Sequence, residues 1–155
     1  NLTGGYFPWP NDKPVPPSLK QAATDVFAFD ALIHNPDRKR DNPNLLWKSD
    51  QLVLIDHESA FAFLLAIPRV QKPWLLNEQH YLTNHIFYQH LRHTQIDLAR
   101  MAGAIQALDE GFWNEAENVI PQEWKGEQFL QIRSHVESVK QHLEDFINDI
   151  RRILQ

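Results

Sequence analysis

Apolar residues recur every three to four positions in residues 18–35 and again from about Glu127 to the end of the chain. This is the spacing of an amphipathic helix, so each stretch is expected to bury one face. Ser18 can serve as the N-cap of the first helix, and Pro36 closes it by biasing the preceding residue away from helical geometry. The apolar positions are Ala22, Val26, Phe27, Phe29, Leu32 and Ile33 in the first helix, and Phe129, Ile132, Val136, Val139, Leu143, Phe146, Ile150 and Ile153 in the last.

Further helices are expected between these two. The pattern predicts one helix over residues 77–93, a second over 96–108 and a shorter one over 109–120. Residues 59–70 are apolar, and the prolines around the end of that stretch indicate a loop. Most of the chain is thus predicted to be helical.

Two short strands are predicted in the first half of the chain. Residues 44–48 (NLLWK) and 51–55 (QLVLI) are mostly apolar and partly β-branched, and the turn-like pair Ser49-Asp50 separates them. A hairpin alone is only marginally stable in water, so we expect it to pack against the helices. The predicted fold class is mainly α with a small β-hairpin.

The length of 155 residues is that of one domain. Residues 1–17 contain five prolines and two glycines, which predicts an irregular arm. We expect residues 18–66 to hold the first helix, a polar loop and the hairpin, and residues 67–155 to form the helical remainder of a single domain.

Composition and charge limit the classes of function. The net charge of −5 disfavours a non-specific binder of nucleic acid or of anionic membranes, because such proteins carry a basic face. The chain has no cysteine, so disulfides and thiolate metal sites are excluded. No apolar run has the length of a membrane span, and no signal peptide is visible. These features predict a cytoplasmic protein.

The loop between the first helix and the hairpin has polar residues at an informative spacing. Asp37 is followed by Lys39 and, five residues after Asp37, by Asn42; Asp56 comes directly after the second strand. Protein kinases have this layout, in which a carboxylate takes the proton of the acceptor hydroxyl, while an amide oxygen and a second carboxylate bind Mg²⁺. Lys39 would place positive charge near the transferred phosphate. Turn chemistry is the alternative, since Asp, Asn and Pro also bend chains for local reasons.

Neighbouring polar residues are assigned supporting roles. Asp30 lies among apolar residues, and we expect it to brace the loop by hydrogen bonds because a buried carboxylate needs partners. Arg38 is expected to pair with a nearby acid, and Arg40 to be solvated. Asn44 is a second candidate metal ligand, but we favour a role in which its side chain supports the loop backbone.

Four histidines fall within residues 77–93, at positions His80, His85, His90 and His93. Their spacings of five, five and three do not place them on one helix face, as two metal-binding histidines would require. We therefore interpret this segment as a helix with a mixed surface and core character.

The segments FDALIHNPDRKRDNPNLLW and LVLIDHESAF, within Phe29–Phe61, resemble the catalytic and metal-binding segments of the HipA-like kinases, which are relatives of the phosphatidylinositol 3/4-kinase and protein-kinase fold. Many of these relatives have His where this chain has Lys39, and His57 and Glu58 replace the Phe-Gly that follows the metal-binding Asp in protein kinases.

The resemblance implies a kinase-like C-terminal lobe and the cofactors ATP and Mg²⁺. It implies that Asp37 is the catalytic acid/base, that Asn42 is a metal ligand and that Asp56 is the principal Mg²⁺ ligand. Asn42, Asp56 and Lys39 are thus the expected contacts of the nucleotide, with Lys39 assigned from its charge. A protein hydroxyl, a lipid head group and a small molecule all stay open as the phosphoryl acceptor.

The sequence has no Gly-rich phosphate loop before a strand and no strand Lys in the kinase context. We expect that a nucleotide-covering lobe precedes Asn1 in a longer protein, that another chain supplies it, or that this chain is a remnant. The alternative to a phosphotransferase is therefore a non-catalytic kinase-lobe remnant that acts as a helical protein-binding module. A weaker third hypothesis is an all-helical scaffold whose loop only resembles the motif.

Overall fold

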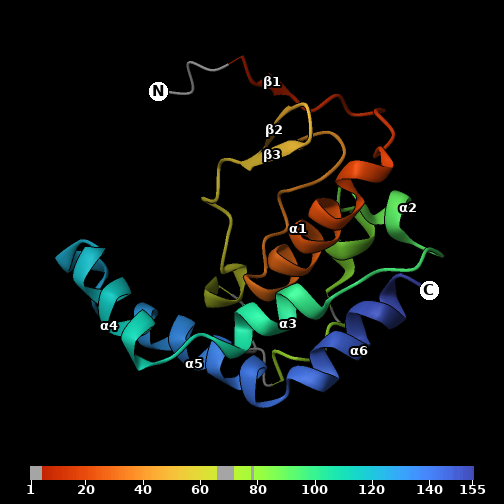
Figure 1. Ribbon diagram of the computed structural model, residues 1–155. Helices are drawn as coiled ribbons and strands as arrows, with labels where there is room; N and C mark the ends of the chain where they lie inside the picture. The colour runs from red at the N-terminus through yellow and green to blue at the C-terminus, as the bar shows by residue number, and fades with distance from the viewer. Residues whose placement is uncertain (1–4, 66–71, 78) are drawn as a thin grey trace.

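A computed structural model describes residues 5–65, 72–77 and 79–155, and its architecture is mainly helical with a small sheet, as predicted (Figure 1). The helices are α1 (Lys20–Leu32), α2 (Tyr88–Leu91), α3 (Ala99–Gln106), α4 (Glu110–Val119), α5 (Glu127–Gln141) and α6 (Leu143–Ile153). The strands are β1 (Phe7–Pro8), β2 (Leu45–Lys48) and β3 (Gln51–Leu54). Four 3₁₀ turns, η1 to η4, span Pro17–Leu19, Ala62–Leu65, His80–Asn84 and Gln122–Trp124.

The sheet contains the predicted hairpin and one strand that the sequence did not reveal. β2 and β3 pair antiparallel, with Lys48 opposite Gln51 across the two-residue turn. β1, which lies in the predicted irregular arm, pairs with β2 so that Phe7 is opposite Trp47. Trp9 follows β1 and is buried, with its ring edge-on to both Trp47 and Phe87. This aromatic contact attaches the arm and the sheet to the helical part of the protein.

The first helix starts and ends differently from the prediction. The chain already turns at Pro17, so Ser18 lies inside η1 and caps neither η1 nor α1 with its side chain. α1 ends at Leu32 because His34 adopts a left-handed conformation (φ 48°). The backbone N–H of Asn35 then donates to the Asp30 carbonyl and that of His34 to the Ala31 carbonyl, which is a Schellman motif.

The single helix predicted over residues 77–93 is wrong. The segment forms η3 and the short α2, and between them His85 has an extended backbone (φ −55°, ψ 141°). Here the chain pairs with the polar loop, since His85 forms a β-bridge to Lys39 and the Ile86 N–H donates to the Arg38 carbonyl at 3.1 Å. Pairing with a distant segment therefore overrides the local helical pattern.

The long last helix is also interrupted. It divides at His142 (φ −115°, ψ 36°), whose ring stacks on Trp74 with centroids 3.7 Å apart. The Leu76 N–H donates to the Asp149 carboxylate, which ties α6 to the same segment, residues 72–77. The break changes the direction of the apolar face predicted for this helix. Most of the buried apolar residues of the two helices belong to α6: Leu143, Phe146, Ile147 and Ile150.

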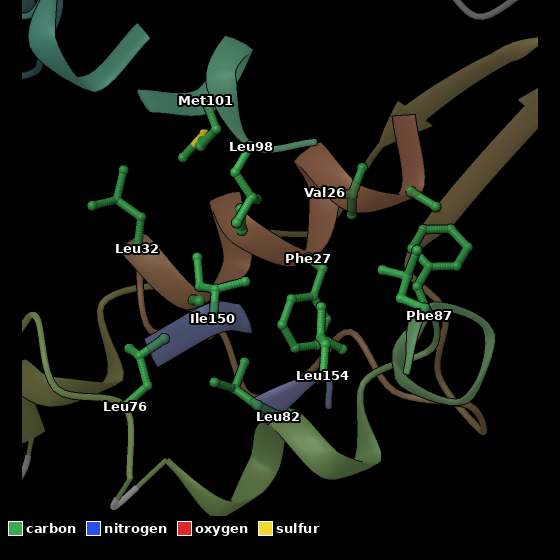
Figure 2. Packing of buried hydrophobic residues seen from close by; sticks show 14 of the residues in the cluster. Val26, Phe27, Leu32, Leu76, Leu82, Phe87, Leu98, Met101, Ile150 and Leu154 are labelled. Carbon is green, nitrogen blue, oxygen red and sulfur yellow. The ribbon is translucent and has the colours of Figure 1, made fainter. Parts of the chain in front are cut away.

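The hydrophobic core surrounds α1, most of whose side chains are buried. Phe27 of α1 lies in a cluster with Leu82 of η3 and Leu154 after α6 (Figure 2). Leu98 and Met101, at the start of α3, belong to the same cluster. Because this core holds α1 on several sides, the loop that leaves its C-terminal end starts from a fixed point. Within the described part of the chain, no helix has the length and apolarity needed to cross a membrane.

The shorter helix predicted over 109–120 is confirmed as α4, and its start has a local cause. The Asp109 side chain accepts a hydrogen bond from the Phe112 N–H at 3.0 Å. Replacing Asp109 with alanine is expected to cost about 1 kcal/mol of local stability through loss of this N-cap. Amide hydrogen exchange in α4 measures the change. Glu117→Ala, within the same helix, is the control and should slow rather than speed exchange, because alanine favours helix.

Candidate functional site

The loop between α1 and β2 brings three of the predicted site residues together. The Asn42 side-chain amide donates to Asp37 Oδ2 at 2.8 Å, and Lys39 Nζ lies 3.7 Å from Asp37 Oδ1. The backbones of Lys39 and Asn42 exchange two hydrogen bonds of 3.1 Å, so the loop closes on itself. Asp37, Lys39 and Asn42 are therefore close in space as well as in sequence.

Asn44 differs from its expected role. Its side-chain amide donates to Asp37 Oδ2 at 3.0 Å, so it supports the carboxylate and not the loop backbone. Its carbonyl accepts hydrogen bonds from the Arg38 guanidinium and from the Ile55 N–H. Asn44 has a left-handed backbone (φ 44°), a conformation that Asn tolerates better than most residues. Two amides thus fix one oxygen of Asp37 and leave the other to face Lys39.

Turn chemistry at the start of the loop sets the position of Asp37. The Asn35 side-chain oxygen accepts the Asp37 N–H at 3.2 Å, and Pro36 between them restricts the backbone. Asn35 is itself buried, and its amide donates to Asp30 Oδ1 at 3.0 Å. The bend of the chain at Asn35 and Pro36 thus places the predicted site residue Asp37.

Asp30 is the buried centre of this arrangement. Its Oδ2 accepts a hydrogen bond from Arg38 Nε at 2.5 Å and one from His85 Nε2 at 3.1 Å, and its side chain has no exposed surface. The predictions that Asp30 braces the loop and that Arg38 pairs with an acid are both confirmed. Burial by itself would raise the pKa of Asp30, but its bonds to His85 and Arg38 hold the pKa below its usual value.

His85 is a site residue that the sequence did not reveal. The Phe87 N–H donates to His85 Nδ1 at 3.1 Å, so the ring proton is on Nε2, the atom that faces Asp30. Burial lowers the pKa of His85 despite the nearby carboxylate, and this keeps the ring neutral. Asp30 and Arg38 are therefore the charged members of a cluster that is neutral as a whole. The sequence around His85 contains no pattern that indicates its burial beside Asp30.

Arg38 connects the loop to the segment after β3. All three of its guanidinium nitrogens have acceptors, because Nη1 donates to the Asn44 carbonyl and Nη2 to His57 Nε2 at 3.3 Å. The His57 ring also lies edge-on to Phe29 of α1, with centroids 6.2 Å apart. His57 was not predicted to contact the loop, although it adjoins the predicted metal ligand Asp56. Arg40 is exposed, as predicted.

Asp56 is exposed and follows directly on Ile55, whose N–H bonds to the Asn44 carbonyl at 3.1 Å. Its backbone is left-handed (φ 55°), a conformation that Asp, like Asn, adopts more readily than most residues other than glycine. Among the described residues, no direct hydrogen bond or ion pair joins Asp56 to Asp37 or Asn42. The links between them pass through Asn44 and through the Arg38–His57 contact.

The donor set fits Mg²⁺. Because Asn42 uses its amide nitrogen on Asp37, its side-chain oxygen is the atom available to a cation, and the exposed Asp56 carboxylate supplies further hard oxygens. In the part of the chain that the structure describes, no three His, Asp or Glu side chains are grouped to hold a metal.

The mainly helical fold with its small sheet agrees with the fold class that the sequence predicts. The family model described as HipA-like kinase matches residues 9–150. The chain therefore belongs to the HipA-like kinase family, and the match extends well beyond Phe29–Phe61, where the resemblance was first seen. No curated protein and no solved structure matches the chain.

Proposed function

We propose that this chain is the catalytic lobe of an ATP- and Mg²⁺-dependent phosphotransferase. The observation that carries the proposal is the Asp37 carboxylate, which two amides and Lys39 orient on a loop anchored in the core. A surface turn has no need of such an anchor. Here the buried Asp30, Arg38 and His85 fix the backbone on both sides of Asp37.

Asp37 is proposed as the catalytic acid/base. Both amide donors bind Oδ2, so Oδ1 is the oxygen able to accept the proton of an acceptor hydroxyl. The side chain is partly exposed, which allows an acceptor to reach it. Orienting the carboxylate before the acceptor binds removes part of the entropic cost of reaction.

Lys39 is proposed to stabilise the transferred phosphate. Its ammonium group lies beside Asp37 Oδ1, and its side chain is 42% exposed. Negative charge on the transferring phosphoryl group would therefore meet a fixed positive charge close to the acid/base. The bond to Asp37 keeps Lys39 in place, since an exposed lysine is otherwise mobile.

Asn42 and Asp56 are the residues that would hold Mg²⁺. When bound, Mg²⁺ neutralises charge on the phosphate oxygens of ATP. The Arg38–His57 contact and the Asn44–Ile55 hydrogen bond support this role, because they tie the Asp56 segment to the loop that carries Asn42.

We further propose that this chain acts together with a nucleotide-covering part supplied from elsewhere in the same protein or by a partner chain. The support is chemical: a Gly-rich phosphate loop and a strand Lys are needed over ATP, and the sequence here contains neither. Within this division, the present chain supplies the acid/base and the metal ligands.

Transfer from γ-labelled ATP tests the proposal in the complete gene product. Asp37→Ala is expected to lower labelling of the protein or its acceptor by about 10²–10⁴-fold, and Asp56→Asn by at least a similar factor. Asp41→Ala, in the same loop and exposed, is the matched control and should retain activity. Unchanged labelling in both site variants would refute the assignment. If Mg²⁺-ATP also fails to raise the melting temperature, the non-catalytic binding module is favoured instead.

A further inference from the structure

The hairpin formed by α4, η4 and α5 carries an exposed apolar surface. Figure 1 shows α4 and the start of α5 projecting away from α1 and the sheet. In the described part of the chain, four of the six exposed large hydrophobic side chains lie here. These four define what we call the hairpin surface: Phe112 (44% exposed), Val119 (77%), Trp124 (66%) and Leu130 (63%).

The contacts that link α4 to α5 are made by other side chains. Trp113 already fills the inward side of α4, where its indole N–H donates to Glu137 at 2.6 Å and its ring lies edge-on to Phe129 of α5. An ion pair between Glu110 and Arg133 adds a second link between the two helices. Phe112 and Val119, seven residues apart, lie on one face of α4 beside this contact. Of the four exposed residues, Phe112 also packs within the hairpin, because its ring lies edge-on to Trp113 with centroids 5.0 Å apart.

The composition of the hairpin surface is that of a protein-binding site. Tryptophan and phenylalanine are enriched at the centres of interfaces, and tryptophan is among the residues whose truncation costs most binding energy. Grouped apolar side chains on a soluble surface mark interaction sites, whereas single ones need no explanation. Trp124, with two-thirds of its surface exposed, is the candidate anchor.

Charge identifies the kind of partner. Residues 109–133 contain six acidic and two basic side chains, a net charge of −4, whereas the other residues together carry only −1. Glu115 and Glu117 on α4 and Glu123 in η4 are exposed next to the apolar residues. A second copy of this chain would bring like charge to the contact, and anionic lipids or nucleic acids would be repelled. The partner that complements this acidic surface is therefore one with a basic surface.

We propose that the hairpin surface binds a basic amphipathic segment of another protein. Its apolar side chains would pack on Trp124, Val119 and Phe112, while its lysines or arginines would face the surrounding glutamates. The site is remote in sequence from Asp37 and Asp56 and does not depend on phosphoryl transfer. A protein acceptor or a regulatory subunit could each carry such a segment.

The test uses the full chain and a fluorescently labelled synthetic peptide of leucine and lysine at helical spacing. Saturable binding by anisotropy is expected, with shifts of Trp124 and α4 signals in two-dimensional NMR spectra. Trp124→Ser should weaken binding by about tenfold or more. Phe7→Ser, which removes a similarly exposed aromatic ring from β1, is the matched control and should leave binding unchanged. The double change Glu115→Gln with Glu117→Gln should weaken binding and reduce its dependence on salt concentration. Glu144→Gln on α6 is the control for charge and should change neither.

Several outcomes would overturn the proposal. A peptide of the same composition with its leucines scattered around the helix should bind at least tenfold more weakly. Equal binding of the two peptides would show that electrostatic attraction alone accounts for the binding. Self-association that Trp124→Ser abolishes would assign the surface to a second copy. Binding to uncharged phosphatidylcholine vesicles that the same variant abolishes would assign it to a membrane. Absence of saturable peptide binding below about 1 mM would refute it outright.

Discussion

Replacing Arg38 with methionine is expected to lower the free energy of unfolding by about 3–5 kcal/mol. The Asp30 carboxylate has no exposed surface, and Arg38 is its only positively charged partner among the described residues because His85 is neutral. Methionine keeps much of the volume of the side chain but none of its donors. The variant therefore leaves a buried charge without compensation and also frees the Asn44 carbonyl and His57.

Chemical denaturation measures this effect, and the chain offers a close control. Arg40→Met removes the same charge two residues away, where the side chain is exposed, and should change stability by no more than about 0.5 kcal/mol. Combining Arg38→Met with Asp30→Asn should cost less than the sum of the two single changes, because the uncompensated charge is gone. Additive costs, or equal effects of Arg38→Met and Arg40→Met, would contradict a buried ion pair as the anchor of the loop.

Stability is expected to fall steeply as the pH drops below about 6.5, owing to a pair of buried histidines near the start of the loop. The rings of His34 and His135 lie 4.9 Å apart, and Phe63 stacks on His135 with centroids 4.1 Å apart. His34 Nε2 accepts a hydrogen bond from the Gln79 amide, and His135 Nε2 donates to the Leu32 carbonyl. Burial lowers the pKa of His34 to about 3 and that of His135 to about 4.

The sign of the effect follows from proton uptake. Unfolded histidine has a pKa of about 6.5, so between this value and the folded values the unfolded chain binds more protons than the native protein. The stability that depends on keeping both rings neutral is fully present above about pH 6.5. It is lost as the pH falls towards the folded-state pKa values of about 4 for His135 and about 3 for His34. Each histidine contributes a slope of about 1.4 kcal/mol per pH unit, so the pair removes about 3–4 kcal/mol between pH 6.5 and 5.

Urea denaturation at a series of pH values between 7.5 and 5 measures this slope. His34→Gln and His135→Gln keep a polar side chain without the titrating ring, and each should reduce the slope although it lowers stability at pH 7.5. His80→Gln is the control, because His80 is exposed and should leave the slope as it is. The same slope in all four proteins would show that these two rings do not titrate on unfolding.

Local patterns predicted the elements that depend on local chemistry. The apolar spacing of α1, the hairpin around Ser49-Asp50 and the helix after Asp109 are all confirmed, because residues a few positions apart determine them. The pairing of β1 with β2 was missed because two residues of a proline-rich arm have no strand pattern of their own. The breaks at His85 and His142 were missed because contacts with Lys39 and Trp74 cause them.

In the candidate site, too, the residues set by local sequence could be predicted and those set by distant contacts could not. Asp37, Lys39 and Asn42 could be selected from the sequence because their spacing follows from the chemistry of one loop, and the structure brings them together. Asp30 and Arg38 could be predicted as bracing residues because a carboxylate among apolar neighbours requires partners. The proposal that Asp56 and Asn42 share a metal ion remains a prediction. The contacts of His85 and His57 with the loop could not be predicted. The segment around His85 has no pattern that refers to the loop, and the motif that contains His57 does not show that its ring reaches Arg38.

The contact between Asp30 and His85 spans 55 residues, and this has a consequence for the order of events during synthesis. At about 5–20 residues per second, the loop leaves the ribosome roughly 3 to 10 seconds before the segment that covers it. Until then Asp30 and Arg38 remain in water, where an ion pair contributes little. The nascent loop therefore has no stable form of its own, and it can take its native form only after the segment that carries His85 has docked.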